Sequence, residues 1–288
     1  MTPTAPLAHS WAFEAIGTLW RIDAASPLDD GVRDEITDAI GAFDRDWSRF
    51  RADSLVTRLS QTGGGVPAPA DAAAMLDAYD ALDAATSGAV NPLVGESLAR
   101  RGYDATYSLV DRGAVAAPLD WRRSVTWSDG TLRLAEPALL DVGALGKGRL
   151  ADLVLTRVPG GAAVVDAGGD IAIRGTTQRI ALEHPYDASV AIGVWSVTDA
   201  ALCASAVNRR AWGEGLHHVL DARTGQPVRQ YAATWAVARD AMTADAVATA
   251  LFFDGGPQLA AEWGVGWVRM RTDGSVEWSP QCEAELFS

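Results

Sequence analysis

Residues 141–148 read Asp141-Val-Gly-Ala-Leu-Gly-Lys147-Gly148 and lie between an apolar run, Ala138-Leu139-Leu140, and a segment with helical spacing, 149–158. This order predicts a strand, a glycine turn and a helix, an arrangement that suits an anion, since glycines let the backbone approach it and a helix N-terminus presents free N–H groups. Lys147 adds a positive charge. A stretch of this kind on its own is more often a tight turn with a solvated lysine, and it lacks the Lys-Ser/Thr pair of a P-loop.

Two more stretches of small and polar residues follow. Asp166-Ala-Gly-Gly169-Asp170 joins two predicted strands with little side-chain bulk, which suits a ligand lying close to the backbone but also fits a simple bulge. His218-Val-Leu-Asp221-Ala-Arg-Thr-Gly225 places a histidine, the usual proton carrier near neutral pH, before a glycine turn. An ordinary strand histidine would have a structural role, so neither stretch decides a function alone.

A fourth stretch, Ala244-Asp245-Ala-Val-Ala-Thr249-Ala250, predicts a helix. Side chains four residues apart lie on one helix face, so the Asp245 carboxylate and the Thr249 hydroxyl could reach one cation. Both are hard oxygen ligands, which Mg²⁺ prefers. With Thr243 as the N-cap, however, Asp245 would lie in the first helical turn, where the helix dipole favours any carboxylate.

The rest of the chain alternates short strands and helices. Apolar residues at three- and four-residue spacings predict one helix opened by Ser26-Pro27 and ending near Asp46, and another between Asp71 and Ser87. Asp-Gly pairs at 129–130 and 273–274 predict two hairpins. The pattern predicts an α+β fold in one unit, residues 1–288, with residues 135–141 as the candidate for a boundary. Predicted strands cover 10–23, 162–166, 171–174, 179–183, 190–197 and 235–238.

The order and spacing of the four stretches resemble the flavin transferase family called ApbE, the FAD:protein FMN transferases. The resemblance extends toward the N-terminus. Ala15-Ile-Gly17-Thr18 is similar to the family's Met-Gly-Thr element, residues 47–54 to its Ser-x-[Tyr/Phe]-x-x-x-Ser segment, and Gly88-Ala-Val-Asn91-Pro92 to its Gly-Ala-Phe-Asp-Pro. It implies an ApbE-like, T-fold-related α+β fold with mixed, largely antiparallel sheets and flanking helices.

The resemblance also implies a reaction: Mg²⁺-dependent transfer of FMN from FAD to a Thr or Ser hydroxyl of an acceptor protein, with release of AMP. The catalytic candidates are His218, Lys147 and Asp245, where His218 would deprotonate the acceptor hydroxyl or orient the phosphate. The metal candidates are the Gly146 main-chain carbonyl, Asp245 and Thr249. The candidates for binding FAD are Gly17, Thr18, Phe50, Asp141, Gly143, Lys147, Asp166, Gly168, Gly169, Asp170, Ser205, His218, Thr224 and Gly225.

The chain departs from the family pattern at three places. Ala144 replaces the second glycine of Asp-x-Gly-Gly-Ile-Ala-Lys-Gly, and Ala222 replaces a proline. Residues 204–208 keep only Ser205 of a stretch, Thr-Ser-Gly-[Asp/Asn]-[Tyr/Phe], that packs along the flavin in the family. Phe50 or Trp212 is the candidate for a compensating aromatic ring.

Composition limits the remaining possibilities. A chain of 288 residues with 48% hydrophobic content can bury a substantial core, and Cys203 and Cys282 have no paired or metal-ligand spacing, so we expect reduced thiols. A net charge of −13 disfavours nucleic acid and acidic membrane surfaces. Because no secretory signal and no apolar run of about 18 residues is visible, we expect a cytoplasmic protein without a membrane anchor.

Two alternatives to the transferase stay open. If water replaces the acceptor, the same site would be a FAD pyrophosphatase that yields FMN and AMP. The departures at Ala144, residues 204–208 and Ala222 motivate the other alternative, a FAD-binding protein with weakened catalysis. A redox flavoenzyme is disfavoured, because no Gly-x-Gly-x-x-Gly follows an early strand and no Cys-x-x-Cys is present.

Overall fold

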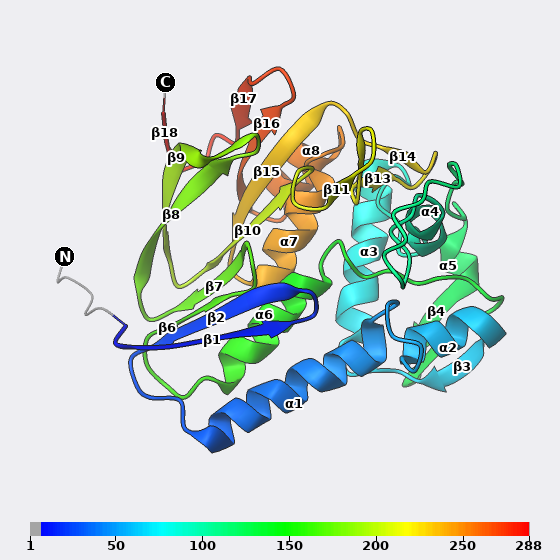
Figure 1. Ribbon diagram of the computed structural model, residues 1–288, viewed down its shortest axis with the longest axis horizontal. Coiled ribbons are helices and arrows are strands. Elements are labelled where there is room, and N and C mark those ends of the chain that lie inside the picture. The colour runs from blue at the N-terminus through cyan, green and yellow to red at the C-terminus, as the bar shows by residue number, and fades with distance from the viewer. Residues whose placement is uncertain (1–6, 288) are drawn as a thin grey trace.

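The computed structural model describes residues 7–287, and an eight-stranded antiparallel sheet lies at its centre (Figure 1). The strand order is β1-β2-β6-β7-β10-β15-β16-β17, and all neighbours pair antiparallel. The strands are β1 (His9–Ala15), β2 (Thr18–Ala24), β6 (Ala163–Asp166), β7 (Asp170–Arg174), β10 (Ala201–Ala206), β15 (Tyr231–Ala238), β16 (Gly266–Arg271) and β17 (Val276–Trp278).

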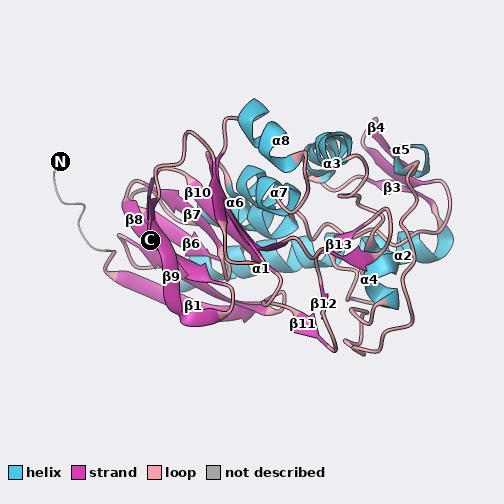
Figure 2. Ribbon diagram, turned by 90° about the horizontal axis from the view of Figure 1, so that it is seen from above, coloured by secondary structure: helices cyan, strands magenta, loops and turns pink. Residues whose placement is uncertain are grey.

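Helices cover one face of this sheet. The helices α6 (Gly146–Arg157) and α7 (Ala241–Ala250) pack on β6, β7, β10 and β15, and α1 (Asp30–Trp47) packs on α6 (Figures 1 and 2). Strand side chains alternate between faces. In β6, therefore, Ala163 and Val165 belong to the helix-side core, whereas Val164 belongs to the apolar cluster on the opposite face.

A three-stranded sheet in the order β18-β9-β8 covers that opposite face. Leu182 and Trp195 of this small sheet cluster with Trp235 and Met270 of the central sheet. The two sheets thus enclose a second apolar core, away from the helices. The three strands are β8 (Thr177–His184), β9 (Asp187–Thr198) and β18 (Glu285–Leu286).

Apart from α8, which lies beside α7 and β16, most of the remaining elements lie at the end of the molecule away from β8 and β9 (Figure 1). Here β3, β5 and β4 form a sheet, and β11 with β12 and β13 with β14 form two short hairpins. The helix-side core contains side chains from before and after residues 135–141. The elements are α2 (Leu55–Thr62), β3 (Gly64–Pro67), α3 (Ala72–Thr86), α4 (Gly95–Arg100), α5 (Trp121–Ser124), β4 (Val125–Ser128), β5 (Thr131–Leu134), β11 (Ala211–Trp212), β12 (Leu216–His217), β13 (Leu220–Asp221), β14 (Gln226–Pro227) and α8 (Gly256–Glu262).

The predicted α+β organisation is confirmed, but four boundaries were wrong. The first helix begins after Asp29, whose side chain accepts from the Val32 N–H, and not at Ser26-Pro27. Residues 10–23 form a hairpin instead of one strand, because Ile16 and Gly17 turn with φ of 43° and 75°. Residues 138–140 form no strand, whereas α6 begins at Gly146, near the start expected from the glycine turn.

The start of α7 is the fourth correction. Asp240, rather than Thr243, caps the helix, and its carboxylate accepts from the Thr243 N–H at 2.8 Å. Asp245 is therefore the fifth helical residue, beyond the first turn in which the dipole acts on any carboxylate. Within residues 7–287, no helix is long and apolar enough to span a membrane.

Candidate functional site

A cavity of about 360 Å³ lies between the turn of the β1–β2 hairpin, α1, the start of α6 and the end of α7. This volume is typical of small-molecule and cofactor sites. Nine of the predicted site residues line it: Gly17, Phe50, Asp141, Gly143, Gly146, Lys147, Ser205, His218 and Thr249. Segments distant in the chain thus bring these residues to one place.

The turn that precedes α6 is held from inside by Asp141 and Tyr79. The Asp141 carboxylate accepts from the Gly143 N–H at 2.7 Å, while the buried Tyr79 hydroxyl donates to the Asp141 carbonyl at 3.0 Å. The Ala144 N–H donates to the same hydroxyl oxygen at 3.3 Å. These contacts fix the backbone between Asp141 and the first turn of α6, which carries Lys147.

Lys147 forms a charged cluster with two buried aspartates. Its Nζ lies 2.6 Å from a carboxylate oxygen of Asp170, whose side chain is fully buried. Burial opposes the charge on Lys147, but the carboxylates of Asp170 and Asp245 outweigh it and raise the pKa of the lysine. Burial and the Asp170 charge in turn raise the pKa of Asp245 well above its ordinary value, against the opposing effect of Lys147. The cluster thus holds a lysine charged at the cavity wall.

The three predicted metal ligands lie on α6 and α7, which pack against each other. Asp245 lies near the start of α6 and accepts from the Gly148 N–H at 2.9 Å. The Thr249 hydroxyl donates to the Ala144 carbonyl at 3.2 Å, and Gly146 lines the same cavity as Thr249. Among residues 7–287, no group of three or more His, Cys, Asp or Glu side chains could hold a metal ion. A metal here would therefore need the hydroxyl and main-chain oxygens.

His218 lines the cavity and is half-buried. Burial, Arg210 and His217 lower its pKa to about 3, so the imidazole is neutral at ordinary pH. Its Nδ1 atom is buried and has no hydrogen-bond partner among residues 7–287. The neighbouring His217 instead contacts the Val228 carbonyl through Nε2 at 2.9 Å, which gives that histidine a structural role. Of the pair, His218 is the one free to act on a ligand.

Aromatic rings form another part of the cavity wall. Phe50 and Tyr107 stack with centroids 5.1 Å apart and an interplanar angle of 6°, and Tyr103 meets both edge-on. The Arg49 guanidinium lies over Phe50 and Tyr103, 4.2 and 5.0 Å from their centroids. Trp212 does not reach the cavity lining; it stacks on Tyr103, and its indole N–H donates to the Arg101 carbonyl. Phe50, of the two predicted rings, is the one in the wall.

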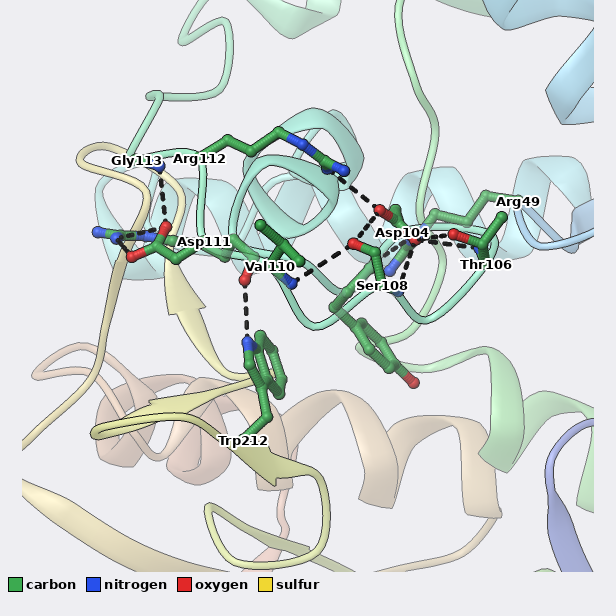
Figure 3. Close-up of polar contacts among 11 residues, drawn as sticks. Arg49, Asp104, Thr106, Ser108, Val110, Asp111, Arg112, Gly113 and Trp212 are labelled. Carbon is green, nitrogen blue, oxygen red and sulfur yellow. Dashed lines mark hydrogen bonds and ion pairs between the residues drawn. The ribbon is translucent and has the colours of Figure 1, made fainter.

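Asp104 organises the loop that carries Tyr107 of the cavity wall, and Figure 3 shows Asp104 beside Thr106, Ser108 and Arg112. The Asp104 carboxylate accepts from the N–H and hydroxyl groups of Thr106 and Ser108, and it pairs with Arg112 at 3.1 Å. Those hydrogen bonds lower the pKa of Asp104 far below its ordinary value. Tyr107 itself has a φ of 50°, a conformation that a non-glycine residue adopts only when its surroundings impose it.

Several predicted binding residues lie outside the cavity lining. Thr18 packs against Gly168, and the Asp166 carboxylate accepts from the Gly168 and Gly169 N–H groups at 2.9 and 3.2 Å, which shapes the turn between β6 and β7. Asp170 does not line the cavity but forms an ion pair with Lys147, which does. Thr224 and Gly225 belong to the β13–β14 turn, where the Gly225 carbonyl accepts from Arg101 and its backbone leaves no room for a side chain beside Val115. These positions support the site's framework.

Two departures from the family pattern have a structural explanation. The Ala222 N–H donates to the Ala89 carbonyl at 3.0 Å, a bond that a proline could not make. Ala144 is not among the residues with a positive φ, so the turn does not require glycine there. Neither alanine disturbs the backbone around the cavity. Residues 204–206 lie at the end of β10, with Ser205 at the cavity.

The cavity residues that the sequence prediction missed include Arg49, Tyr103, Tyr107 and Arg210. Arg49 stands inside the predicted aromatic segment, and the closely spaced tyrosines at 103 and 107 form an aromatic pair within a polar loop. This pair of tyrosines was a signal in the sequence that could have indicated an aromatic binding wall. Arg210 is brought beside His218 by the short β11–β12 hairpin, whose turn contains Gly213 and Gly215, and these glycines were a second signal.

Comparison with known proteins settles the family. The sequence pattern of the ApbE family matches residues 16–265, most of the chain. The chain belongs to the ApbE family. A Rhodobacter capsulatus relative named FAD:protein FMN transferase is 28% identical over 311 aligned positions, which cover 98% of this chain and 59% of the relative. The chain thus spans about three-fifths of that ApbE protein's length.

Solved structures of ApbE proteins share the fold. The Thermotoga maritima ApbE protein superposes with a TM-score of 0.80 at 22% identity, and covers 94% of this chain and 97% of its own. The Pseudomonas stutzeri flavinyl transferase ApbE in its apo form gives 0.77 at 20% identity over 94% of each chain. The Vibrio cholerae flavin transferase ApbE gives 0.73 at 20% identity, with 94% and 97% covered. The ApbE-like α+β fold predicted from the sequence is confirmed.

Proposed function

We propose that this ApbE protein is a Mg²⁺-dependent FAD:protein FMN transferase, which moves FMN from FAD to a Thr or Ser hydroxyl of an acceptor protein and releases AMP. One observation carries the proposal: a single cavity joins an aromatic wall to Lys147, His218 and the Ala144–Thr249 contact. A cofactor with a planar ring and a pyrophosphate needs both kinds of surface. Family membership and the name of the Rhodobacter capsulatus relative support this activity.

The local charge of the cavity suits an anionic substrate, although the chain carries a net charge of −13. Lys147 is held charged by Asp170 and Asp245, and Arg210 also lines the cavity. Positive side chains at the wall of a cleft attract and orient phosphate groups. We assign Lys147 and Arg210 to the pyrophosphate of FAD.

The donor set around Asp245 fits Mg²⁺. One carboxylate, the Thr249 hydroxyl and the Ala144 carbonyl are hard oxygen ligands, and Mg²⁺ usually takes few protein ligands together with substrate phosphate and water. A bound Mg²⁺ supplies positive charge that neutralises the developing charge on the pyrophosphate. We therefore assign the ion to Asp245, Thr249 and a main-chain carbonyl of the turn, that of Gly146 or of Ala144, both of which line the cavity.

In the transfer, the acceptor hydroxyl oxygen forms a bond to the phosphorus of the FMN half of FAD, and the bond from that phosphorus to the bridging oxygen breaks, so AMP leaves. The hydroxyl proton must go to a base. His218 is neutral and its buried Nδ1 has no partner, so it can accept this proton. The low pKa of His218 belongs to the cavity without FAD, and a pyrophosphate nearby would favour the protonated ring.

Substituting Asp245 separates catalysis from simple FAD binding. We expect Asp245→Asn and Asp245→Ala to reduce AMP release by about 10²-fold or more, because the metal site loses its carboxylate. The affinity for FAD, measured by flavin fluorescence, should change far less. Asp38→Asn, at an exposed position of α1, is the matched control.

The same experiment distinguishes the two alternatives. FMN and AMP that accumulate in the absence of an acceptor, with no labelled protein when an acceptor is added, would assign the chain as a FAD pyrophosphatase. Tight FAD binding without AMP release in wild-type protein would assign a FAD-binding protein. Wild-type turnover by Asp245→Asn would contradict the proposed site.

A further inference from the structure

Arg49 leaves one buried donor group unused. Its side chain is only 2% exposed; Nε lies 2.5 Å from the Asp141 carboxylate, and Nη1 donates to the Tyr103 carbonyl at 2.7 Å. Nη2 is buried and has no hydrogen-bond partner within the part of the chain that is described. A buried donor without a partner is costly, and most are satisfied in native proteins. Nη2 therefore calls for an acceptor from a ligand.

The aromatic side chains around Arg49 indicate the kind of ligand that would accept from Nη2. The residue lines the cavity, and its guanidinium stacks over Phe50 and Tyr103. Tyr107 stacks in turn on Phe50. Aromatic faces of this kind favour a planar ring as their partner. The free N–H groups of Arg49 thus lie where a ring would pack.

Charge narrows the choice of acceptor atom. Asp141 lies in hydrogen-bonding contact with Arg49, so the pair is close to neutral and offers little attraction to a phosphate. Lys147 and Arg210, which line the same cavity, are the cations that we assign to the phosphate groups. A neutral carbonyl oxygen in the plane of a ring suits an N–H group of a planar guanidinium.

We propose that Arg49 is a specificity-determining residue, whose Nη2 donates to a carbonyl oxygen at the pyrimidine edge of the flavin ring. Arg49 would thereby select the flavin half of FAD over its adenine half. The inference rests on the proposed function for the identity of the ligand. It concerns binding alone, so it does not depend on the transfer step.

Ligand selectivity provides the test. Wild-type protein, Arg49→Lys and Arg49→Gln are titrated with FAD, riboflavin and ADP by calorimetry. A hydrogen bond from a charged donor corresponds to about 10- to 100-fold in affinity, so both variants should bind FAD and riboflavin that much more weakly. ADP binding should change by less than about twofold, because ADP lacks the flavin ring. Arg45→Gln, at an exposed position of α1, should leave all three affinities unchanged.

Each other outcome overturns the assignment. If both Arg49 variants bind riboflavin as tightly as wild type, Arg49 does not contact the flavin ring. If only FAD and ADP bind more weakly, Arg49 contacts the adenine half. If riboflavin and ADP lose affinity equally, the role of Arg49 is structural. Wild-type protein gives a second measurement should the variants not fold. It should bind 2-thioriboflavin or 4-thioriboflavin about tenfold more weakly than riboflavin, since sulfur is the poorer acceptor. Equal affinity for all three flavins would contradict the proposal.

The flavin test is separable from the proposed function. If wild-type protein binds riboflavin with the predicted dependence on Arg49 but transfers no FMN, the transferase assignment fails and the role of Arg49 stands. If FMN is transferred and Arg49→Gln binds riboflavin as tightly as wild type, the reverse holds.

Discussion

Replacing Gly148 with alanine would separate the two helices that carry the charged cluster. Gly148 lies in the first turns of α6, where that helix meets the start of α7. An added Cβ would lie 2.6 Å from the Ala241 carbonyl carbon, 2.7 Å from the Asp245 Cβ and closer still to the Ala241 carbonyl oxygen. Two of these three atoms are main chain, so a side-chain rotation cannot relieve the overlap.

The structure sets the size of the effect. Carbon atoms pack at about 3.5 Å or more, so the helices must move apart by roughly 1 Å. Overpacking of this kind costs about 1–3 kcal/mol, which corresponds to a melting temperature lower by about 3–10 °C for a chain of this length. A displacement of about 1 Å between Lys147 and Asp245 would reduce transfer about 10²-fold. Thermal unfolding and AMP release measure the two effects separately.

Gly160→Ala is the control for this prediction. Gly160 has no atom within 4 Å of an added Cβ, and its φ is not in the left-handed region. We expect this variant to match wild type in melting temperature and in transfer rate. A Gly148→Ala protein that also unfolds and reacts as wild type would refute the close contact between α6 and α7 on which the site geometry depends.

Three further variants test other parts of the site. His218→Gln should lower the transfer rate at saturating FAD by about 10²–10⁴-fold, with FAD affinity nearly unchanged, because it removes the proposed base. Burial raises the pKa of Asp152 to about 6, although its carboxylate accepts from the Ala241 and Met242 N–H groups. Between about pH 4 and 6, therefore, Asp152 keeps its proton in the folded state and loses it in the unfolded state. Urea unfolding should show wild type losing up to about 3 kcal/mol of stability relative to Asp152→Asn as pH rises through this range. Asp104→Ala should raise the Kd for FAD several-fold while the melting temperature changes little, because the loop that positions Tyr107 loses its acceptor.

For each of these three variants, one result would contradict the prediction. An unchanged rate in His218→Gln removes the base, and equally weakened FAD binding would make His218 a binding residue only. Parallel pH profiles for wild type and Asp152→Asn would show that Asp152 does not hold a proton in the folded state. Wild-type affinity for FAD in Asp104→Ala would show that the loop does not contribute to the cavity.

Local chemistry accounts for the features that could be predicted from the sequence. The α1 stripe of Ile36, Ile40, Phe43 and Trp47 is buried, as its three- and four-residue spacing predicted. The Asp129-Gly130 pair forms the expected hairpin turn, with positive φ at both residues. The family resemblance rested on glycines and short polar motifs of the same local kind, and the comparisons confirmed it.

Tertiary contacts explain the errors. The apolar run 138–140 is read as a strand, but no neighbouring strand pairs with it, and the Asp141 N–H donates to the Pro92 carbonyl instead. Asp240 and Thr243 both precede apolar residues and both suit an N-cap, so spacing alone could not choose between them. The two Asp152 hydrogen bonds to the start of α7, which come from α6, favour the earlier start.

The site was predicted only where its residues lie in motifs. Lys147, His218, Asp245 and Thr249 stand in recognisable stretches, and the fold brings them to one region. The contact between the Thr249 hydroxyl and the Ala144 carbonyl could not be predicted from the sequence, because it depends on the path of the turn, which the Tyr79 hydroxyl holds.

The most direct test of the central claim is covalent labelling. Purified protein is incubated with FAD, Mg²⁺ and a candidate acceptor domain, and flavin fluorescence of the acceptor is read on a denaturing gel beside a chelator control and Asp245→Asn. With Mg²⁺ we expect a fluorescent acceptor and one AMP released for each FMN attached. With the chelator or with Asp245→Asn we expect neither product. Labelling that persists in Asp245→Asn, or AMP release with no labelled acceptor among the Thr- and Ser-containing domains supplied, would contradict it.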